Sequence, residues 1–114
     1  MSDDPRAVVR RHLDAVVAGD VVAMADDYAE DAVLERGGDR FEGRGEIGDY
    51  FRTVPRRLAG GQVDARIDTV NGDRVVVRWC IHGGPQGGIA GVDHYRVIDG
   101  AIRAQRVELT GSDF

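Results

Sequence analysis

Residues 60–82 read GGQVDARIDTVNGDRVVVRWCIH, and this stretch decides the fold class. From Val63 onward apolar and polar residues alternate, which is the period of a half-buried strand. The pair Asn71-Gly72 interrupts the alternation and is typical of a two-residue hairpin turn. Apolar residues then recur at every second position up to Ile81. The stretch therefore predicts two antiparallel strands that share one apolar face.

Two further strands are expected toward the carboxyl end, over residues 89–98 and 101–109. They are separated by Asp99-Gly100, another tight-turn pair. The glycine-rich residues 83–88 lack the lysine and the following helix of a phosphate-binding loop, so we expect a flexible hairpin there. The carboxyl-terminal half of the chain is thus predicted to be a series of hairpin-connected strands.

Upstream of residue 60 the apolar residues follow the period of helices. Asp4 precedes Pro5 at a predicted helix start. Gly19 ends this first helix, and Asp20 begins a second, whose apolar stripe extends to Tyr28. The amino-terminal part is therefore predicted to be helical.

A short strand over residues 32–36 and a brief return over 40–43 precede a third helix. Its apolar stripe reaches Leu58, and Pro55 is expected to kink it or to end it early. The whole pattern predicts one α+β domain of residues 1–114. Three amino-terminal helices are expected to pack in a curved antiparallel sheet, which forms a cone with an internal cavity.

Composition narrows the classes of function. Twenty acidic against fifteen basic residues give a net charge of −5, which argues against a nucleic-acid partner. No apolar run reaches the ~20 residues of a membrane span, and no signal peptide is recognisable, so we expect a cytoplasmic protein. Cys80 is the single cysteine, and His82 and His94 fit no metal-binding spacing. We therefore expect structural or surface roles for these three residues, no metal and no cofactor.

Two motifs resemble a known group of proteins. RHLDAVVAGDVVAMADDYAEDAVLE at residues 11–35 and FEGRGEI at 41–47 resemble the ketosteroid isomerase and SnoaL-like polyketide cyclase group. This group belongs to the nuclear-transport-factor-like superfamily, and the resemblance implies a cone fold, a small-molecule ligand and a homodimer. It does not fix a reaction, because the same fold hosts several reactions and non-catalytic members.

The resemblance also implies site residues. In the resembled isomerases a tyrosine and a protonated aspartic acid form an oxyanion hole, and a second aspartate abstracts the proton. The acid position falls on Asp93 and the tyrosine position on His12. The position of the base falls on Arg36, which stays protonated and cannot act as a base. Tyr28 resembles the supporting tyrosine and is expected to orient His12.

The residues themselves indicate the same place. Positions i and i+2 of a strand share a face, so Asp93 and Tyr95 are expected to face the cavity together. A carboxylate in an apolar wall needs a partner or a proton, and we expect His12 or Arg36 within reach. The residues expected to contact the ligand are Tyr28, Leu34, Phe51, Trp79, Tyr95, Gln105 and Val107.

Structural roles are compatible with the same residues. A register shifted by one would turn Asp93 outward. An inward Asp93 would equally form a structural ion pair with Arg36. His12 is compatible with a half-buried helix residue that has no chemical role. The aromatic residues that are compatible with a purely structural core are Tyr50, Phe51 and Trp79.

Two functional hypotheses follow. The first is a cofactor-independent isomerase, cyclase or dehydratase of a small, largely apolar oxygenated molecule. Asp93 and His12 would be its acid and base, and Arg36 would stabilise an enolate or carboxylate. An epoxide hydrolase is less favoured, because no second cavity aspartate is evident. The alternative is a non-catalytic ligand-binding or dimerisation module, which the replacement of the base by Arg36 supports.

The homodimer is expected to form through outward residues of the sheet, namely Val76, Cys80, Val92 and His94.

Overall fold

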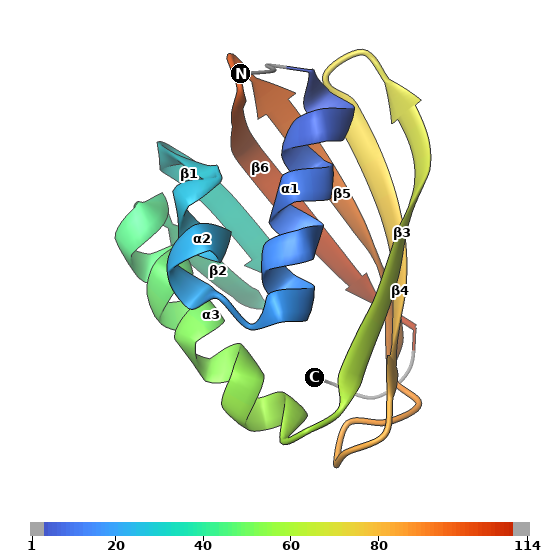
Figure 1. Cartoon of the computed structure of the whole chain (residues 1–114). Helices are drawn as coiled ribbons and strands as arrows, with labels where there is room; N and C mark the ends of the chain where they lie inside the picture. The colour runs from blue at the N-terminus through green and yellow to red at the C-terminus, as the bar shows by residue number, and fades with distance from the viewer. Residues whose placement is uncertain (1–3, 111–114) are drawn as a thin grey trace.

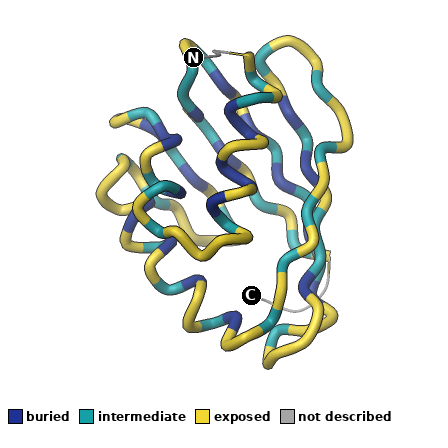
Figure 2. Tube along the Cα trace, in the orientation of Figure 1, coloured by how far each residue is buried: buried dark blue, intermediate teal, exposed yellow. Residues whose placement is uncertain are grey.

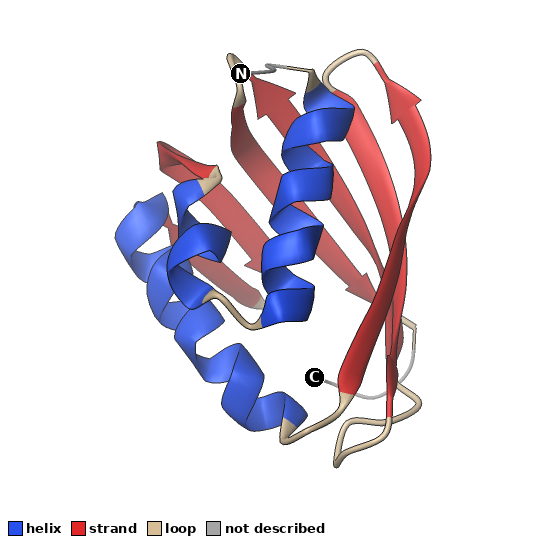
Figure 3. Ribbon diagram, in the orientation of Figure 1, coloured by secondary structure: helices blue, strands red, loops and turns tan. Residues whose placement is uncertain are grey.

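The computed structural model describes residues 4–110 of the 114-residue chain. Three helices, α1 (Pro5–Ala18), α2 (Val21–Asp26) and α3 (Gly43–Leu58), lie on one face of a curved sheet (Figure 1, Figure 3). The strands of this sheet are β1 (Tyr28–Arg36), β2 (Asp39–Glu42), β3 (Gln62–Asn71), β4 (Arg74–His82), β5 (Ala90–Ile98) and β6 (Ala101–Leu109). This architecture confirms the predicted α+β cone.

The six strands are ordered β2-β1-β6-β5-β4-β3. The pairs from β3 to β6 are antiparallel, as the hairpin turns predict. The pairing of β1 with β6 is parallel, so the sheet is mixed and differs there from the expected antiparallel arrangement. No local turn joins these two strands, and their relative direction is therefore set by tertiary packing, which turn residues do not encode.

Aspartates begin the first two helices as predicted. The carboxylate of Asp4 accepts a hydrogen bond from the backbone N–H of Arg6, at 3.3 Å. That of Asp20 accepts one from the N–H of Ala23, at 3.1 Å. Between them Gly19 has a φ of 72°, the left-handed conformation that commonly ends a helix. These caps fix the short α1–α2 connection.

The prediction that Tyr28 belongs to the second helix is wrong. α2 ends at Asp26, and Tyr28 opens β1. The backbone oxygen of Asp27 accepts a bond from the N–H of Ile102 in β6, at 2.8 Å. The side chain of Arg44 donates twice to the backbone oxygen of Tyr28, at 2.9 and 2.8 Å. The backbone oxygens of Asp27 and Tyr28 thus accept hydrogen bonds from outside the helix. These contacts with β6 and Arg44 outweigh the helical spacing of apolar residues that the sequence shows up to Tyr28.

Pro55 does not end α3 early. The helix continues to Leu58, and the N–H of Ala59 donates to the backbone oxygen of Pro55, at 3.0 Å. Ala59 has a φ of 47°, which stops the helix one turn after the proline. A proline in the last turn interrupts little of the helical hydrogen bonding.

The hydrophobic core lies between the helices and the concave face of the sheet. Figure 2 shows less exposed positions alternating with more exposed ones along the strands, as expected where one face packs against the helices. The fully buried core residues with the largest side chains are Tyr28, Met24, Leu34, Ile47, Ile81 and Ile102. This packing leaves a pocket at the inner face of the sheet.

Candidate functional site

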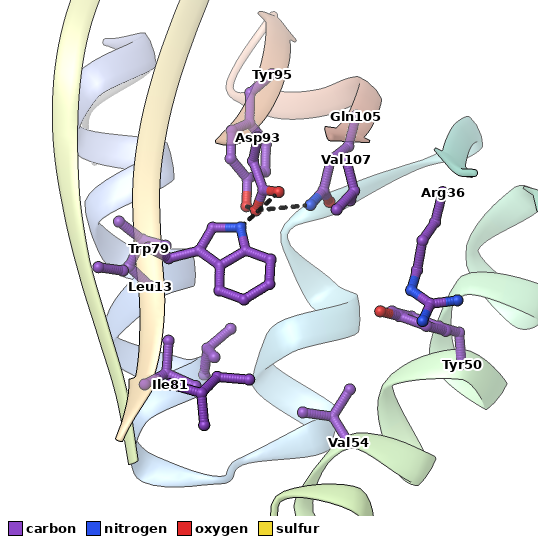
Figure 4. Close-up of a pocket in the computed structure, with 13 residues that line it drawn as sticks. Leu13, Arg36, Tyr50, Val54, Trp79, Ile81, Asp93, Tyr95, Gln105 and Val107 are labelled. Atoms are coloured by element: carbon purple, nitrogen blue, oxygen red, sulfur yellow. Dashed lines mark hydrogen bonds between the residues drawn. The ribbon is translucent and has the colours of Figure 1, made fainter. Parts of the chain in front are cut away.

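A pocket of about 80 Å³ lies between α1, α3 and the inner face of the sheet (Figure 4). It is mostly apolar and is small beside the ~300–1,000 Å³ typical of sites for drug-sized ligands. In this conformation it suits a molecule of few heavy atoms. The lining residues are Leu13, Val16, Arg36, Tyr50, Val54, Val63, Ala65, Trp79, Ile81, Asp93, Tyr95, Gln105 and Val107.

Asp93 is the one carboxylic acid of this lining. It is only 7% exposed. Trp79 Nε1 donates to its Oδ1 at 3.0 Å, and the Tyr95 hydroxyl and Gln105 Nε2 donate to its Oδ2, each at 3.2 Å. Burial raises the pKa of Asp93 from 3.8 to about 6, against the lowering effect of these three hydrogen bonds. Both protonation states are therefore accessible near neutral pH.

A second layer of hydrogen bonds lies behind Asp93. Gln105 uses its amide nitrogen for Asp93 and its amide oxygen to accept a bond from the Tyr28 hydroxyl. The same hydroxyl lies 3.4 Å from Nε2 of His12. Burial raises the pKa of Tyr28 well above 10, so the phenol stays neutral. The result is a continuous chain from His12 through Tyr28 and Gln105 to Asp93.

Asp27 lies at the other end of the His12 ring. Nδ1 of His12 lies 3.6 Å from Oδ2 of Asp27, and the two residues are 1% and 4% exposed. Arg11 reaches in from the surface and donates to Oδ1 of Asp27, at 2.7 Å. The rings of Tyr28, at 5.3 Å, and Phe51, at 5.5 Å, contact the imidazole edge to face. His12 is thus packed between aromatic rings and close to Asp27, but it does not line the pocket.

Arg36 stands at the other side of the pocket. Its side chain is 12% exposed, and its guanidinium lies 3.6 Å from the Asp39 carboxylate. Figure 4 shows this guanidinium beside Tyr50 and directed away from Asp93. The guanidinium of Arg57 also lies over the Tyr50 ring, at 5.3 Å. Arg36 and Tyr50 line a second, more open hollow of about 480 Å³, so they separate it from the inner pocket.

The structure divides the predicted site residues into two groups. The predicted residues that line the pocket are Arg36, Trp79, Asp93, Tyr95, Gln105 and Val107. Those that are buried outside the lining are His12, Tyr28, Leu34 and Phe51. Four predicted ligand or catalytic residues thus support the pocket rather than face it.

The orientation of Asp93 is as expected, but its hydrogen-bond donors are not. Its burial excludes the outward register that the sequence left open. The expected charged partners were His12 and Arg36, whereas the donors are the neutral side chains of Trp79, Tyr95 and Gln105. His12 does not contact Asp93 because the side chains of Tyr28 and Gln105 lie between them.

Asp27 is the part of the network that sequence reasoning misses. It follows Asp26 at the end of a helix, where an acidic residue is usually solvated, and nothing local marks it as buried. The apolar lining residues Val63, Ala65 and Ile81 are different, because they alternate in step with Trp79 and their inward direction is readable from the sequence.

Within residues 4–110, one group of three possible metal ligands occurs, formed by Asp64, Cys80 and His82 on the outer face of the sheet. The pocket itself offers the carboxylate of Asp93 among neutral and cationic side chains. Across the same residues, the helices are too short or too polar to cross a membrane.

Comparison of the sequence with known proteins gives a family match and a curated relative. The profile of the SnoaL-like domain family matches residues 9–105, which is most of the chain. A steroid Δ-isomerase from Nocardioides simplex is 39% identical over 69 residues, which cover 59% of this chain and 53% of that protein. The chain thus spans about half the length of this curated relative.

Solved structures agree with the fold along nearly the whole chain. An NTF2-like protein from Mesorhizobium loti is 26% identical, with a TM-score of 0.83 over 94% of this chain and 91% of that one. A candidate polyketide cyclase from Sinorhizobium meliloti is 25% identical, with a TM-score of 0.78 over 90% of this chain and 94% of that one.

Proposed function

Because the chain belongs to the SnoaL-like domain family, we propose that its pocket binds a small, largely apolar oxygenated molecule and that Asp93 moves a proton on it. One observation carries this proposal. Asp93 is a carboxylic acid in an apolar pocket, and its pKa is about 6. General acid–base catalysis is most effective when the pKa of the group lies near the working pH.

The chemistry needs one carboxyl group and one anion stabiliser. Ionised Asp93 takes a proton from a carbon next to the substrate carbonyl, and the electron pair of the C–H bond forms an enolate. The guanidinium of Arg36 stabilises the negative oxygen. Protonated Asp93 then returns its proton to the same molecule. Return to another carbon gives an isomer, and return to a departing hydroxyl releases water.

In this proposal His12 is a positioning residue rather than the acid or base. It holds the hydroxyl of Tyr28, which donates to Gln105, and Gln105 in turn donates to Asp93. His12, with Asp27 beside it, would thereby orient the Asp93 carboxyl through Tyr28 and Gln105, on the side away from the pocket.

The relatives and the pocket size together favour a class of substrate. One relative is named a steroid Δ-isomerase and another a candidate polyketide cyclase, names that are compatible with carbonyl chemistry. A volume of about 80 Å³ favours a smaller molecule than a steroid in the present conformation. We therefore propose a compact ketone, enone or β-hydroxy carbonyl compound.

Hydrogen–deuterium exchange tests the proposal without a known substrate. A panel of small ketones and β-hydroxy acids is incubated with the protein in D₂O near pD 7, and exchange at the carbon next to the carbonyl is followed by NMR. We expect exchange with the natural protein and loss of roughly 10²-fold or more with Asp93→Asn. Asp14→Asn, at an exposed position of α1 outside the pocket lining, is the matched control and should keep the rate. Equal rates for the natural protein and Asp93→Asn would refute the role of Asp93.

A second function is favoured by one specific observation. Arg36 occupies the position where the resembled isomerases carry their base, and arginine cannot take that role. A ligand-binding module without turnover fits this replacement. The same samples distinguish the two functions, because a module would give ligand binding by saturation-transfer NMR and no exchange.

We also propose that the chain forms a homodimer through the outer face of the sheet. Val76 and Val92 are half-buried there and lie on the neighbouring strands β4 and β5. Light scattering at micromolar concentration should give twice the 12.4 kDa chain mass, and Val92→Arg should lower it to the monomer. A monomeric natural protein would refute this assembly.

A further inference from the structure

Three different kinds of metal ligand meet on the outer face of the β3–β4 pair. Asp64 of β3 lies directly opposite Cys80 of β4, and His82 follows two residues later on the same face. The side chains of Asp64 and His82 are 72% and 66% exposed, and Cys80 is half-buried. In the single chain the cluster is thus accessible to an ion from solvent, and it lies on the opposite side of the sheet from the pocket.

The donor atoms converge on one point. Sγ of Cys80 lies 3.3 Å from Nε2 of His82, and this nitrogen lies 3.8 Å from Oδ2 of Asp64. All three donor atoms lie within 4.8 Å of one another. Tetrahedral zinc with the usual bond lengths separates such donors by roughly 3.4–3.6 Å. Small rotations of exposed side chains are enough to close the difference.

The same three residue types also occur in catalytic Cys–His–Asp triads, but the geometry here differs. In a triad the thiol and the carboxylate contact opposite nitrogens of the imidazole, so that the carboxylate orients the ring. Here Cys80 and Asp64 both face Nε2 of His82. Because both groups face the same nitrogen, the carboxylate of Asp64 cannot orient the ring for proton transfer from the thiol. Three donor atoms that face one another are, however, the arrangement that a shared cation requires.

We propose that Asp64, Cys80 and His82 bind one Zn²⁺ ion, with water as the fourth ligand. A thiolate, an imidazole and a carboxylate are the ligand set that zinc takes in proteins. The thiolate and the carboxylate together neutralise the dication. This neutralisation matters because Arg66 and Arg78 line a surface hollow together with Asp64 and Cys80. The ion would link the edge strand β3 to β4 close to the loop at residues 83–88.

Cobalt spectroscopy tests the site directly. The reduced full-length protein is titrated with Co²⁺, and thiolate charge-transfer and tetrahedral d–d absorption bands are recorded. We expect both bands to saturate at one equivalent and to disappear when Zn²⁺ displaces the cobalt. Isothermal titration calorimetry with Zn²⁺ then gives the dissociation constant.

Single substitutions identify the ligands. Asp64→Asn, Cys80→Ala and His82→Gln should each weaken Zn²⁺ binding by at least roughly 100-fold, more than the loss of an outer-sphere partner. His94→Gln is the matched control, because His94 is also a half-exposed histidine of the outer face but lies against Glu108, at 2.7 Å. Circular dichroism verifies that each variant is folded.

Three results would overturn the zinc site. The first is the absence of a one-equivalent cobalt spectrum in the reduced natural protein. The second is zinc binding that survives Cys80→Ala, and the third is zinc binding that is lost equally in His94→Gln. Asp93→Asn should leave zinc binding unchanged, so failure of the zinc site and failure of the proposed function give distinguishable results.

Discussion

The indole of Trp79 lies across the backbone of Gly91, its direct partner on the neighbouring strand β5. A Cβ atom at Gly91 would lie 2.5 Å from Cζ2 of Trp79 and 2.8 Å from the backbone oxygen of Glu108. The absence of a side chain at this position therefore allows the ring to pack against the backbone of β5. From there its N–H reaches Asp93, two residues further along the same strand.

Gly91→Ala should displace this indole and destabilise the protein. The new methyl group meets both the ring and a backbone oxygen, and overpacking of this kind costs about 1–3 kcal/mol. Trp79 is the single tryptophan, so a change in its fluorescence emission reports the displacement. Urea unfolding measures the loss in the free energy of unfolding.

Gly45→Ala is the matched control for this substitution. Gly45 lies in the first turn of α3 without a positive φ, and apart from the neighbouring helix backbone nothing lies within 4 Å of the added Cβ. Alanine there should leave the fluorescence unchanged and stabilise the helix by about 0.5–1 kcal/mol. Equal effects of the two substitutions would contradict the specific contact between Gly91 and Trp79.

Elements with a local signal are predictable from the sequence. The alternation after Val63, the Asn71-Gly72 turn and the aspartate caps each depend on neighbouring residues, and the structure contains all of them. The inward direction of Asp93 is predictable for the same reason, because a strand has a period of two.

Features set by contacts between distant segments are not predictable in this way. Tyr28 continues a helical stripe in the sequence, but pairing with β6 and the side chain of Arg44 place it in a strand. The hydrogen bond of Tyr28 with Gln105 joins residues 77 positions apart. Sequence periodicity therefore places Asp93 and Tyr95 on one face of a strand, but it does not show that Trp79, Tyr95 and Gln105 donate hydrogen bonds to Asp93.

Tyr28→Phe should lower stability by leaving Gln105 without its donor. The amide oxygen of Gln105 is buried, and a buried polar group that loses its partner costs about 1–3 kcal/mol. Urea unfolding of Tyr28→Phe, Gln105→Leu and the double variant measures the coupling. We expect the double variant to lose less than the sum of the single losses. Strict additivity would show that the two side chains do not interact energetically.

Arg36→Gln should weaken the binding of anionic ligands to the pocket. A charge-assisted hydrogen bond to a guanidinium contributes roughly 1.5–3 kcal/mol, so we expect affinity for a small carboxylate to fall about tenfold or more. Ligand-detected NMR with a panel of short-chain and aromatic carboxylates measures the affinity. Arg40→Gln is the control, because Arg40 is 54% exposed and lies outside the pocket lining. If both substitutions reduced binding equally, the effect would be one of net charge and not of Arg36.

The ionisation of Asp93 should destabilise the folded protein as the pH rises. The pKa of this group is about 6 in the folded state and 3.8 when unperturbed. Below about pH 4 both states hold the proton, and Asp93 makes no difference to stability. Between about pH 4 and pH 6 only the folded state holds it, so the free energy of unfolding falls as the pH rises. A shift of about two pKa units corresponds to a loss of about 3 kcal/mol, which is complete above pH 6.

Asp93→Asn has no proton to lose at this position, so its stability relative to the natural protein should increase across this window and then stay constant. Urea unfolding of both proteins at pH 4, 5, 6, 7 and 8 measures the difference, in which the other titrating groups cancel. A difference that does not change with pH would contradict the raised pKa, and with it the reason for assigning the proton transfer to Asp93.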